Sequence, residues 1–205
     1  MRTIILAALA VSACFGNTVY FQSSTANTNN SGSSTIAATV DSSWATALTS
    51  PSPTPSIWIT DSGNPEPALG TSVTFTQNIT LGSFTSAILD LGVYADDSAT
   101  VVLDGTTLFT EDTTLGTHCA AGPIGCVSGT EGIESNLNVS SIVHSGVNTL
   151  TIQDFQEVGY TPFGVDFDGS ITTSTAATPE PTSAFLLSGC VLGAAWLRRR
   201  AAKRA

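Results

Sequence analysis

The sequence predicts an all-β fold, a two-sheet sandwich with an export segment at each end of the chain. Apolar residues in the middle of the chain alternate with polar ones and do not recur at helical spacing. Turn residues separate these short runs at regular intervals, which is typical of sandwiches. Both ends of the 205-residue chain combine an apolar run with basic residues, which leaves roughly one domain between them.

The N-terminal segment has the composition of a secretory signal peptide. Arg2 precedes a short apolar run, and small residues follow at Ala13 and Gly16. Residues 1–16 are therefore predicted to direct export, with cleavage after one of these small residues. As an alternative, Cys14 fits the acylated position of a lipoprotein.

The sandwich itself is predicted over residues 36–173. Residues 17–35 are polar and low in complexity, so we expect a flexible lead-in, although Val19–Phe21 could start a strand. The predicted strand segments are, in chain order, Ile36–Val40, Ile57–Ile59, Thr71–Thr80 with Val73, Phe75 and Ile79 on one face, Ala87–Val93, Thr100–Leu103, Thr106–Phe109, Leu150–Ile152 and Val165–Ile171.

Asp104-Gly105 separates two of these runs and predicts a β-hairpin, because both turn positions need positive φ. The surrounding segment Tyr94–Gly105 resembles the hairpin of galactose-binding-like jelly rolls, which occur as modules of carbohydrate-active enzymes. His144–Ile152 resembles a strand of the same fold, and Gly169 would lie in the final strand. The resemblance implies a jelly-roll β-sandwich and leaves the function open.

Asp96 and Asp97 lie where one predicted strand turns into this hairpin. We expect their carboxylates to cap backbone N–H groups within the turn. A contact with calcium or with sugar hydroxyls is the alternative, although calcium takes about six to eight oxygen ligands and the sequence does not assemble such a set. Asp166 and Asp168 alternate with apolar residues, so we expect them on the solvated face of a strand.

Cys119 and Cys126 bracket a short loop, and in an oxidising compartment we expect a local disulfide between them. His118 adjoins the first of these cysteines, but two Cys and one His are too few for a structural zinc, and no metal site is predicted. Trp44 and Trp58 have two interpretations. They either stack on sugar rings, which would make Trp58 a ligand contact, or they fill the core of the sandwich.

The distribution of charge excludes some functions. All sixteen Asp and Glu residues lie between Asp41 and Glu180, and all six Lys and Arg residues lie outside that interval. We therefore expect no nucleic-acid binding, since phosphate contacts depend on Lys and Arg. An acidic exterior could recruit divalent cations such as Ca²⁺. The sequence contains none of the common hydrolase or nucleotide-binding motifs, so no enzyme is predicted.

The C-terminal tail has three parts after a linker at 174–178. Pro179, Glu180 and Pro181 form an extended step, residues 184–197 form an apolar span, and a basic tail over 198–205 contains Arg198, Arg199 and Arg200. This order resembles the PEP-CTERM sorting signal of exopolysaccharide-producing Gram-negative bacteria, over residues 179–205. An ordinary anchor is the alternative, but the fourteen residues of the span would cover only about 21 Å of the roughly 30 Å hydrocarbon core.

These observations predict an exported, non-catalytic cell-surface or extracellular-matrix protein. The sorting resemblance implies a single transmembrane helix, transient anchoring in the inner membrane, and processing by an exosortase before transfer to the cell surface or matrix. The alternative is a carbohydrate-binding module that docks on exopolysaccharide, with or without calcium.

Overall fold

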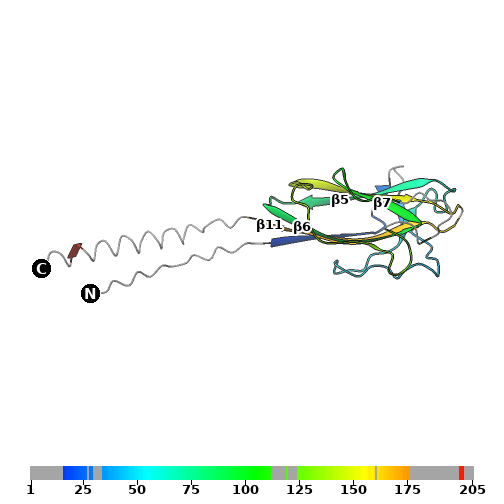
Figure 1. Ribbon diagram of the computed structural model, residues 1–205, viewed down its shortest axis with the longest axis horizontal. Coiled ribbons are helices and arrows are strands. Elements are labelled where there is room, and N and C mark those ends of the chain that lie inside the picture. Colours follow the sequence, from blue (N-terminus) through cyan, green and yellow to red (C-terminus); the bar gives the residue numbers. More distant parts are fainter. Residues whose placement is uncertain are drawn as a thin grey trace. The chain divides into compact units, whose positions relative to one another are not determined.

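Two antiparallel β-sheets pack face to face in the computed structural model, which describes residues 16–26, 28–29, 34–111, 119, 124–159, 161–175 and 199–200. Figure 1 shows β6 and β11 in one layer and β5 and β7 in the other. The described residues from Gly16 to Ser174 form one unit of the chain. The predicted all-β sandwich is therefore confirmed.

The first sheet has the strand order β3-β4-β11-β6-β9, and β1 pairs with β11 beside β4. The second sheet has the order β2-β5-β10-β7-β8. The first sheet contains β1 (Gly16–Gln22), β3 (Thr35–Ala37), β4 (Ile59–Asp61), β6 (Ser86–Asp96), β9 (Gly132–Asn138) and β11 (Gly164–Ser174). The second contains β2 (Thr28–Asn29), β5 (Ser72–Leu81), β7 (Ser98–Leu103), β8 (Thr106–Phe109) and β10 (Gly146–Phe155).

The core lies between the sheets and is built from the apolar residues that alternate along the strands. Side chains of a β-strand point to opposite faces in turn, so every second residue reaches the core. The predicted inward sets are all buried. They include Val73, Phe75 and Ile79 on β5, Ala87, Leu89, Leu91 and Val93 on β6, and Val165, Phe167 and Ile171 on β11.

The hairpin between β7 and β8 is also as predicted. Asp104 and Gly105 occupy the turn with φ of 44° and 80°. Positive φ at both positions matches the right-handed twist of the flanking strands. The Asp104 carboxylate also accepts a hydrogen bond from the Thr149 N–H at 2.7 Å, which fixes the turn to β10.

The predicted flexible lead-in at 17–35 needs correction, because the sandwich begins at β1. All seven residues of β1 pair with β11, from Gly16 opposite Ser174 to Gln22 opposite Asp168. Phe21 is 5% exposed and packs in the core. The alternative of a strand at Val19–Phe21 is thus the correct one, and the strand is longer than local composition indicates because it pairs with β11, about 150 residues away in sequence.

The prediction that Asp166 and Asp168 face solvent is wrong, since both are fully buried. The segment 38–58 covers this outer face of β11. Its backbone N–H groups at Leu48 and Ser52 donate to Asp166 and Asp168 at 2.8 and 2.9 Å. Ser23 Oγ donates a further hydrogen bond to Asp166 at 2.9 Å.

Most residues of the predicted export segments lie outside the described part of the chain. These are residues 1–15, the Pro179-Glu180-Pro181 step, the span at 184–197 and Arg198; Cys14 and His118 are also outside it. Arg199 and Arg200 are described and exposed. None of the helical structure within the described ranges is long and apolar enough to cross a bilayer.

Candidate functional site

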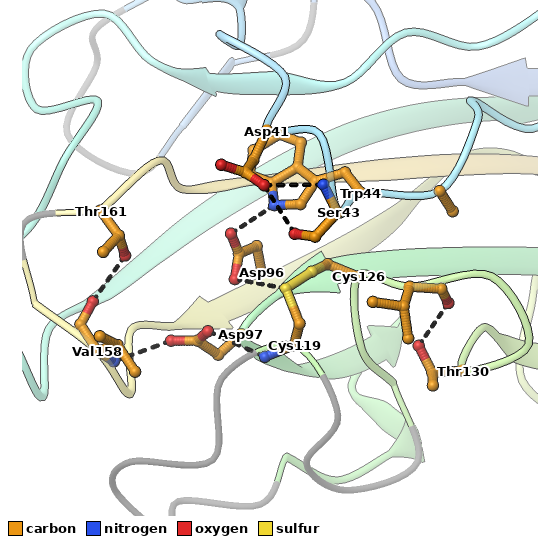
Figure 2. Close-up of a disulfide and its surroundings, with 12 residues drawn as sticks. Asp41, Ser43, Trp44, Asp96, Asp97, Cys119, Cys126, Thr130, Val158 and Thr161 are labelled. Carbon is orange, nitrogen blue, oxygen red and sulfur yellow. Dashed lines mark hydrogen bonds between the residues drawn. A yellow bond between two sulfur atoms is a disulfide. The ribbon is translucent and has the colours of Figure 1, made fainter.

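One end of the sandwich is organised around Asp96 and Asp97, where the chain passes from β6 in the first sheet to β7 in the second. The peptide bond between them is cis, and both side chains are fully buried. Carboxyl groups in such a position need hydrogen-bond partners, because burying one without them costs about 1–3 kcal/mol or more. The partners come from loops on both sides of this junction (Figure 2).

Asp97 holds two distant segments by their backbones. Its Oδ2 accepts hydrogen bonds from the N–H groups of Glu157 and Val158 at 2.7 and 3.0 Å, and its Oδ1 accepts one from Cys119 at 3.2 Å. Figure 2 shows the carboxylate between these segments. Asp97 therefore caps backbone N–H groups, but these groups belong to remote loops, so the expected capping within its own turn is wrong.

Asp96 binds the indole of Trp44, whose Nε1 donates to Oδ2 at 2.6 Å. Burial, and then the hydrogen bond and negative charge of Asp97, raise the pKa of Asp96 to about 9, although the Trp44 hydrogen bond acts to lower it. The other oxygen lies 3.4 Å from Cys119 Sγ. A disulfide sulfur carries no proton, so this contact is a hydrogen bond only when Asp96 is the protonated donor.

The expected disulfide joins Cys119 and Cys126, with Cα atoms 4.7 Å apart. It lies in a second apolar cluster beside Trp44, Trp58 and Tyr94. The two indoles pack with ring centroids 4.3 Å apart, and Trp58 Nε1 donates to the Ala45 carbonyl at 3.0 Å.

Of the two interpretations of Trp58, the structure favours core packing. The residue is only 4% exposed, whereas stacking on a sugar requires an accessible ring face. The candidate contacts Asp96, Asp97 and Trp58 are therefore brought into one neighbourhood, but all three are buried and serve to hold the loops together.

This end of the sandwich also contains a close group of metal-type ligands among the described residues. One ligand atom each from Asp96, Cys119 and Cys126 lie within 4.8 Å of one another. The disulfide bond leaves neither sulfur as a thiolate, and the thiolate is the form that binds metals. This group therefore does not make a metal site.

A groove lies on the outer face of the first sheet, between the covering segment 38–58 and β9. It has a volume of about 360 Å³, and Leu48, Pro51 and Ile133 line it with apolar surface. Gly92 lies on its β6 side, and a Cβ at that position would come within 3.3 Å of the Leu48 side chain. The lack of a side chain there keeps the strand surface open beside the loop.

Three acidic residues, Asp90, Glu131 and Glu134, also line this groove. Asp90 Oδ1 accepts the Asn136 N–H at 2.8 Å. Glu131 Oε2 accepts hydrogen bonds from Tyr94 Oη and a backbone N–H at 3.0 and 2.8 Å. Backbone hydrogen bonding and Tyr94 lower the pKa of Glu131, so the groove carries negative charge at neutral pH.

Sequence reasoning missed this groove because its walls come from segments far apart in the chain. One local signal was present. Every second residue of β6 faces outward, and among these residues Gly92 is the one without a side chain. A glycine inside a strand often marks a place where a ligand or another backbone comes close.

No protein-family model matches the chain, and no curated protein matches it in sequence. Among solved structures it is similar to a family 35 carbohydrate-binding module from Clostridium thermocellum, with 13% identity and a TM-score of 0.40, over 75% of this chain and 97% of that one. A CBM36-1 domain of a multidomain xylanase from the hindgut metagenome of Trinervitermes trinervoides matches with 12% identity and a TM-score of 0.31, over 76% and 96%.

An FMN-binding β-glucuronidase from Facaelibacterium prausnitzii L2-6 matches with 18% identity and a TM-score of 0.32. The match covers 52% of this chain and spans only 17% of that enzyme. All three TM-scores lie below 0.5, so these likenesses carry no argument about what this chain binds.

Proposed function

We propose that this protein is an exported, non-catalytic surface protein whose sandwich binds polysaccharide in the groove between segment 38–58 and β9. The observation that carries this proposal is the groove itself, with its volume of about 360 Å³ and its mixed apolar and carboxylate lining. Its exopolysaccharide ligand would lie across the outer surface of β6, beside Gly92.

The lining suits the chemistry of sugars. A pyranose presents C–H faces that pack on apolar side chains, here Leu48, Pro51 and Ile133. Its hydroxyl groups are donors, and the carboxylates of Asp90 and Glu134 are acceptors. Because the chain has no Lys or Arg from Gly16 to Thr175, the groove favours neutral over acidic polysaccharides.

The test is affinity electrophoresis of the purified protein through gels that contain neutral or uronic-acid polysaccharides. Ile133→Ala is expected to weaken binding by about fivefold to tenfold, since it removes apolar contact worth roughly 1–1.4 kcal/mol. Val147→Ala is the matched control, because Val147 is 55% exposed, Ile133 is 58% exposed, and only Ile133 lines the groove.

Glu134→Gln should weaken binding to a smaller extent, because the amide keeps one acceptor oxygen. Equal retardation of the wild type and Ile133→Ala in every gel would reject the groove as the site. Running each gel with calcium and with a chelator tests whether the binding needs calcium.

We further propose that the C-terminal segment sorts this domain through the inner membrane to the cell surface or matrix, with an exosortase as its partner. The support is the order of Pro179-Glu180-Pro181, the apolar span 184–197 and Arg198–Arg200. The folded domain ends at Ser174, so only a short linker separates it from the proline step.

Mass spectrometry of the surface protein tests this sorting proposal. The C-terminal peptide should end near Pro179-Glu180-Pro181 in cells with the exosortase, and at the full-length terminus in cells without it. Replacing Pro179 and Pro181 by alanine should leave the precursor uncut, while Pro53→Ala in the covering segment should not affect cutting. Identical C-terminal peptides with and without the enzyme would contradict the proposal.

A further inference from the structure

The floor of the groove belongs to a row of paired residues on the outer face of the first sheet. Gly92 of β6 pairs with Ile133 of β9 on one side and with Asp168 of β11 on the other. Residues that pair directly in an antiparallel sheet point to the same face, with Cβ atoms about 4.5–5.5 Å apart. Because Gly92 has no side chain, Ile133 and Asp168 lie on either side of a strip of bare backbone, and Gly92 lines the groove there.

Asp168 places an unsatisfied acceptor beside this floor. Its Oδ1 accepts the Ser52 N–H at 2.9 Å, and the two residues before Ser52, which are Ser50 and Pro51, line the groove. Its Oδ2 is buried and has no hydrogen-bond partner in the part of the chain that the structure describes. Burial raises the pKa of Asp168, and the Ser52 N–H offsets this only in part. A hydrogen-bond donor with positive charge is therefore what this side of the groove lacks.

The groove itself combines apolar surface with negative charge. Its lining includes the carboxylates of Asp90, Glu131 and Glu134, and none of the described residues that line it is basic. Backbone hydrogen bonding and the Tyr94 hydroxyl lower the pKa of Glu131, which keeps that carboxylate ionised. Since no Lys or Arg occurs between residues 16 and 175, the domain supplies no cationic side chain of these types to offset this charge. The potential in the groove therefore favours a cationic ligand over a neutral or an acidic one.

We infer that the groove binds a polysaccharide whose hexosamine units carry free, protonated amino groups. This inference rests on the proposed function, polysaccharide binding in the groove, and names the class of sugar. An ammonium group donates charge-assisted hydrogen bonds to carboxylates, whereas N-acetylation leaves a neutral amide in its place. The C–H face of the same sugar ring packs on Leu48, Pro51 and Ile133. A lysine-rich peptide offers the charge without this ring face.

The experiment compares two soluble polymers that differ only at the amino group. These are glycol chitosan and the same polymer after complete N-acetylation. Isothermal titration measures the binding of each to the purified full-length protein at low salt and about pH 6, where amino groups are protonated. The wild type is expected to bind the amino polymer about fivefold to tenfold more tightly than the acetylated one, and added salt should reduce this ratio.

Glu134→Gln separates the charge of the groove from the net charge of the chain, which is −10. It removes one charge from the lining and should lower the preference for the amino polymer by about twofold to fivefold. Glu66→Gln is the matched control, because Glu66 is exposed and does not line the groove, and it should leave the preference unchanged. Poly-lysine is the third ligand and should bind more weakly than the amino polymer, while Ile133→Ala should weaken the binding of both sugar polymers.

Three results would overturn the amino-sugar inference. The first is a wild type that does not bind the amino polymer more tightly than the acetylated one. The second is an equal loss of preference in Glu134→Gln and Glu66→Gln, because the preference would then come from net charge. The third is equally tight binding of poly-lysine, which would make the ligand a cationic peptide. The proposed function fails separately, when Ile133→Ala changes the binding of no polysaccharide.

Discussion

Backbone N–H groups are the hydrogen-bond donors to buried carboxylates in this domain, a role that Lys and Arg side chains share in most proteins. Asp97, Asp166 and Asp168 accept hydrogen bonds from backbone N–H groups of loops. Such charge-assisted bonds are stronger than neutral ones. With no basic side chain from Gly16 to Thr175, the backbone is the main source of donors that can hold these acids inside.

The buried acids predict an unusual dependence of stability on pH. The pKa of Asp96 is about 9 in the folded protein, against an ordinary value of 3.8 for an unperturbed aspartate. Its contribution to stability is complete below about pH 4 and is lost as pH rises towards 9, because only the folded state keeps the proton in that interval. The slope from such a group is about 1.4 kcal/mol per pH unit.

Urea unfolding between pH 4 and pH 9, in the presence of a chelator, measures this slope. Asp96→Asn should reduce the slope, since an amide does not titrate, but part of the slope should remain because burial also raises the pKa of Asp154 and of Asp166. Glu66→Gln, which removes an exposed carboxylate, serves as the control. A wild-type stability that rises steadily from pH 4 to pH 9 would contradict the assignment of a protonated Asp96.

The residue-scale features that the sequence predicts are the local ones. The Asp104-Gly105 turn and the Cys119–Cys126 pairing depend on residues a few positions apart. The bond from Trp44 to Asp96 joins residues 52 positions apart, and the alternation pattern of β6 contains no information about it. The same limit explains why the alternation along β11 places Asp166 in solvent.

At the scale of elements, β1 depends on a glycine in its neighbour. Phe21 of β1 packs directly over Gly169 of β11, where a Cβ would overlap the Phe21 ring. A side chain at this position would displace the ring from the core. The Phe21 ring of the edge strand β1 therefore fits in the core because the facing residue on β11 has no side chain.

Gly169→Ala is expected to destabilise the domain by about 1–3 kcal/mol through overpacking. Gly82→Ala is the matched control, because nothing lies within 4 Å of a Cβ built there. Urea unfolding measures the difference, and limited proteolysis should cut the Gly169→Ala variant within β1 first. Equal stability of the two variants would show that Phe21 finds an alternative position without cost.

The strand pattern made β5, β6, β7, β10 and β11 predictable, because apolar residues alternate with polar ones along part or all of each strand. The covering segment 38–58 was not predictable as a layer. It is extended and rich in Pro and Ser, and its place on β11 is set by its backbone donors meeting Asp166 and Asp168.

At the scale of the whole molecule, the position of β1 predicts where the folded domain begins, and truncated chains can test this prediction. A chain that starts at Ser23 loses the burial of Phe21 and the pairing of β1, and should be destabilised by about 3–5 kcal/mol. A chain that starts at Gly16 should match the full-length protein. Thermal and urea unfolding of the three chains distinguish a domain that begins at β1 from one that begins at residue 36. If the domain began at residue 36, all three chains would have equal stability.

The pairing of Gly16 with Ser174 determines where the two ends of the sandwich domain lie. The start of β1 and the end of β11 lie next to each other, so the chain enters and leaves the sandwich at the same end. Asp96 lies at the opposite end of β6, whose eleven residues extend about 35 Å at about 3.3 Å each. The Asp96–Asp97 junction therefore lies at the end of the sandwich that is remote from Gly16 and Ser174.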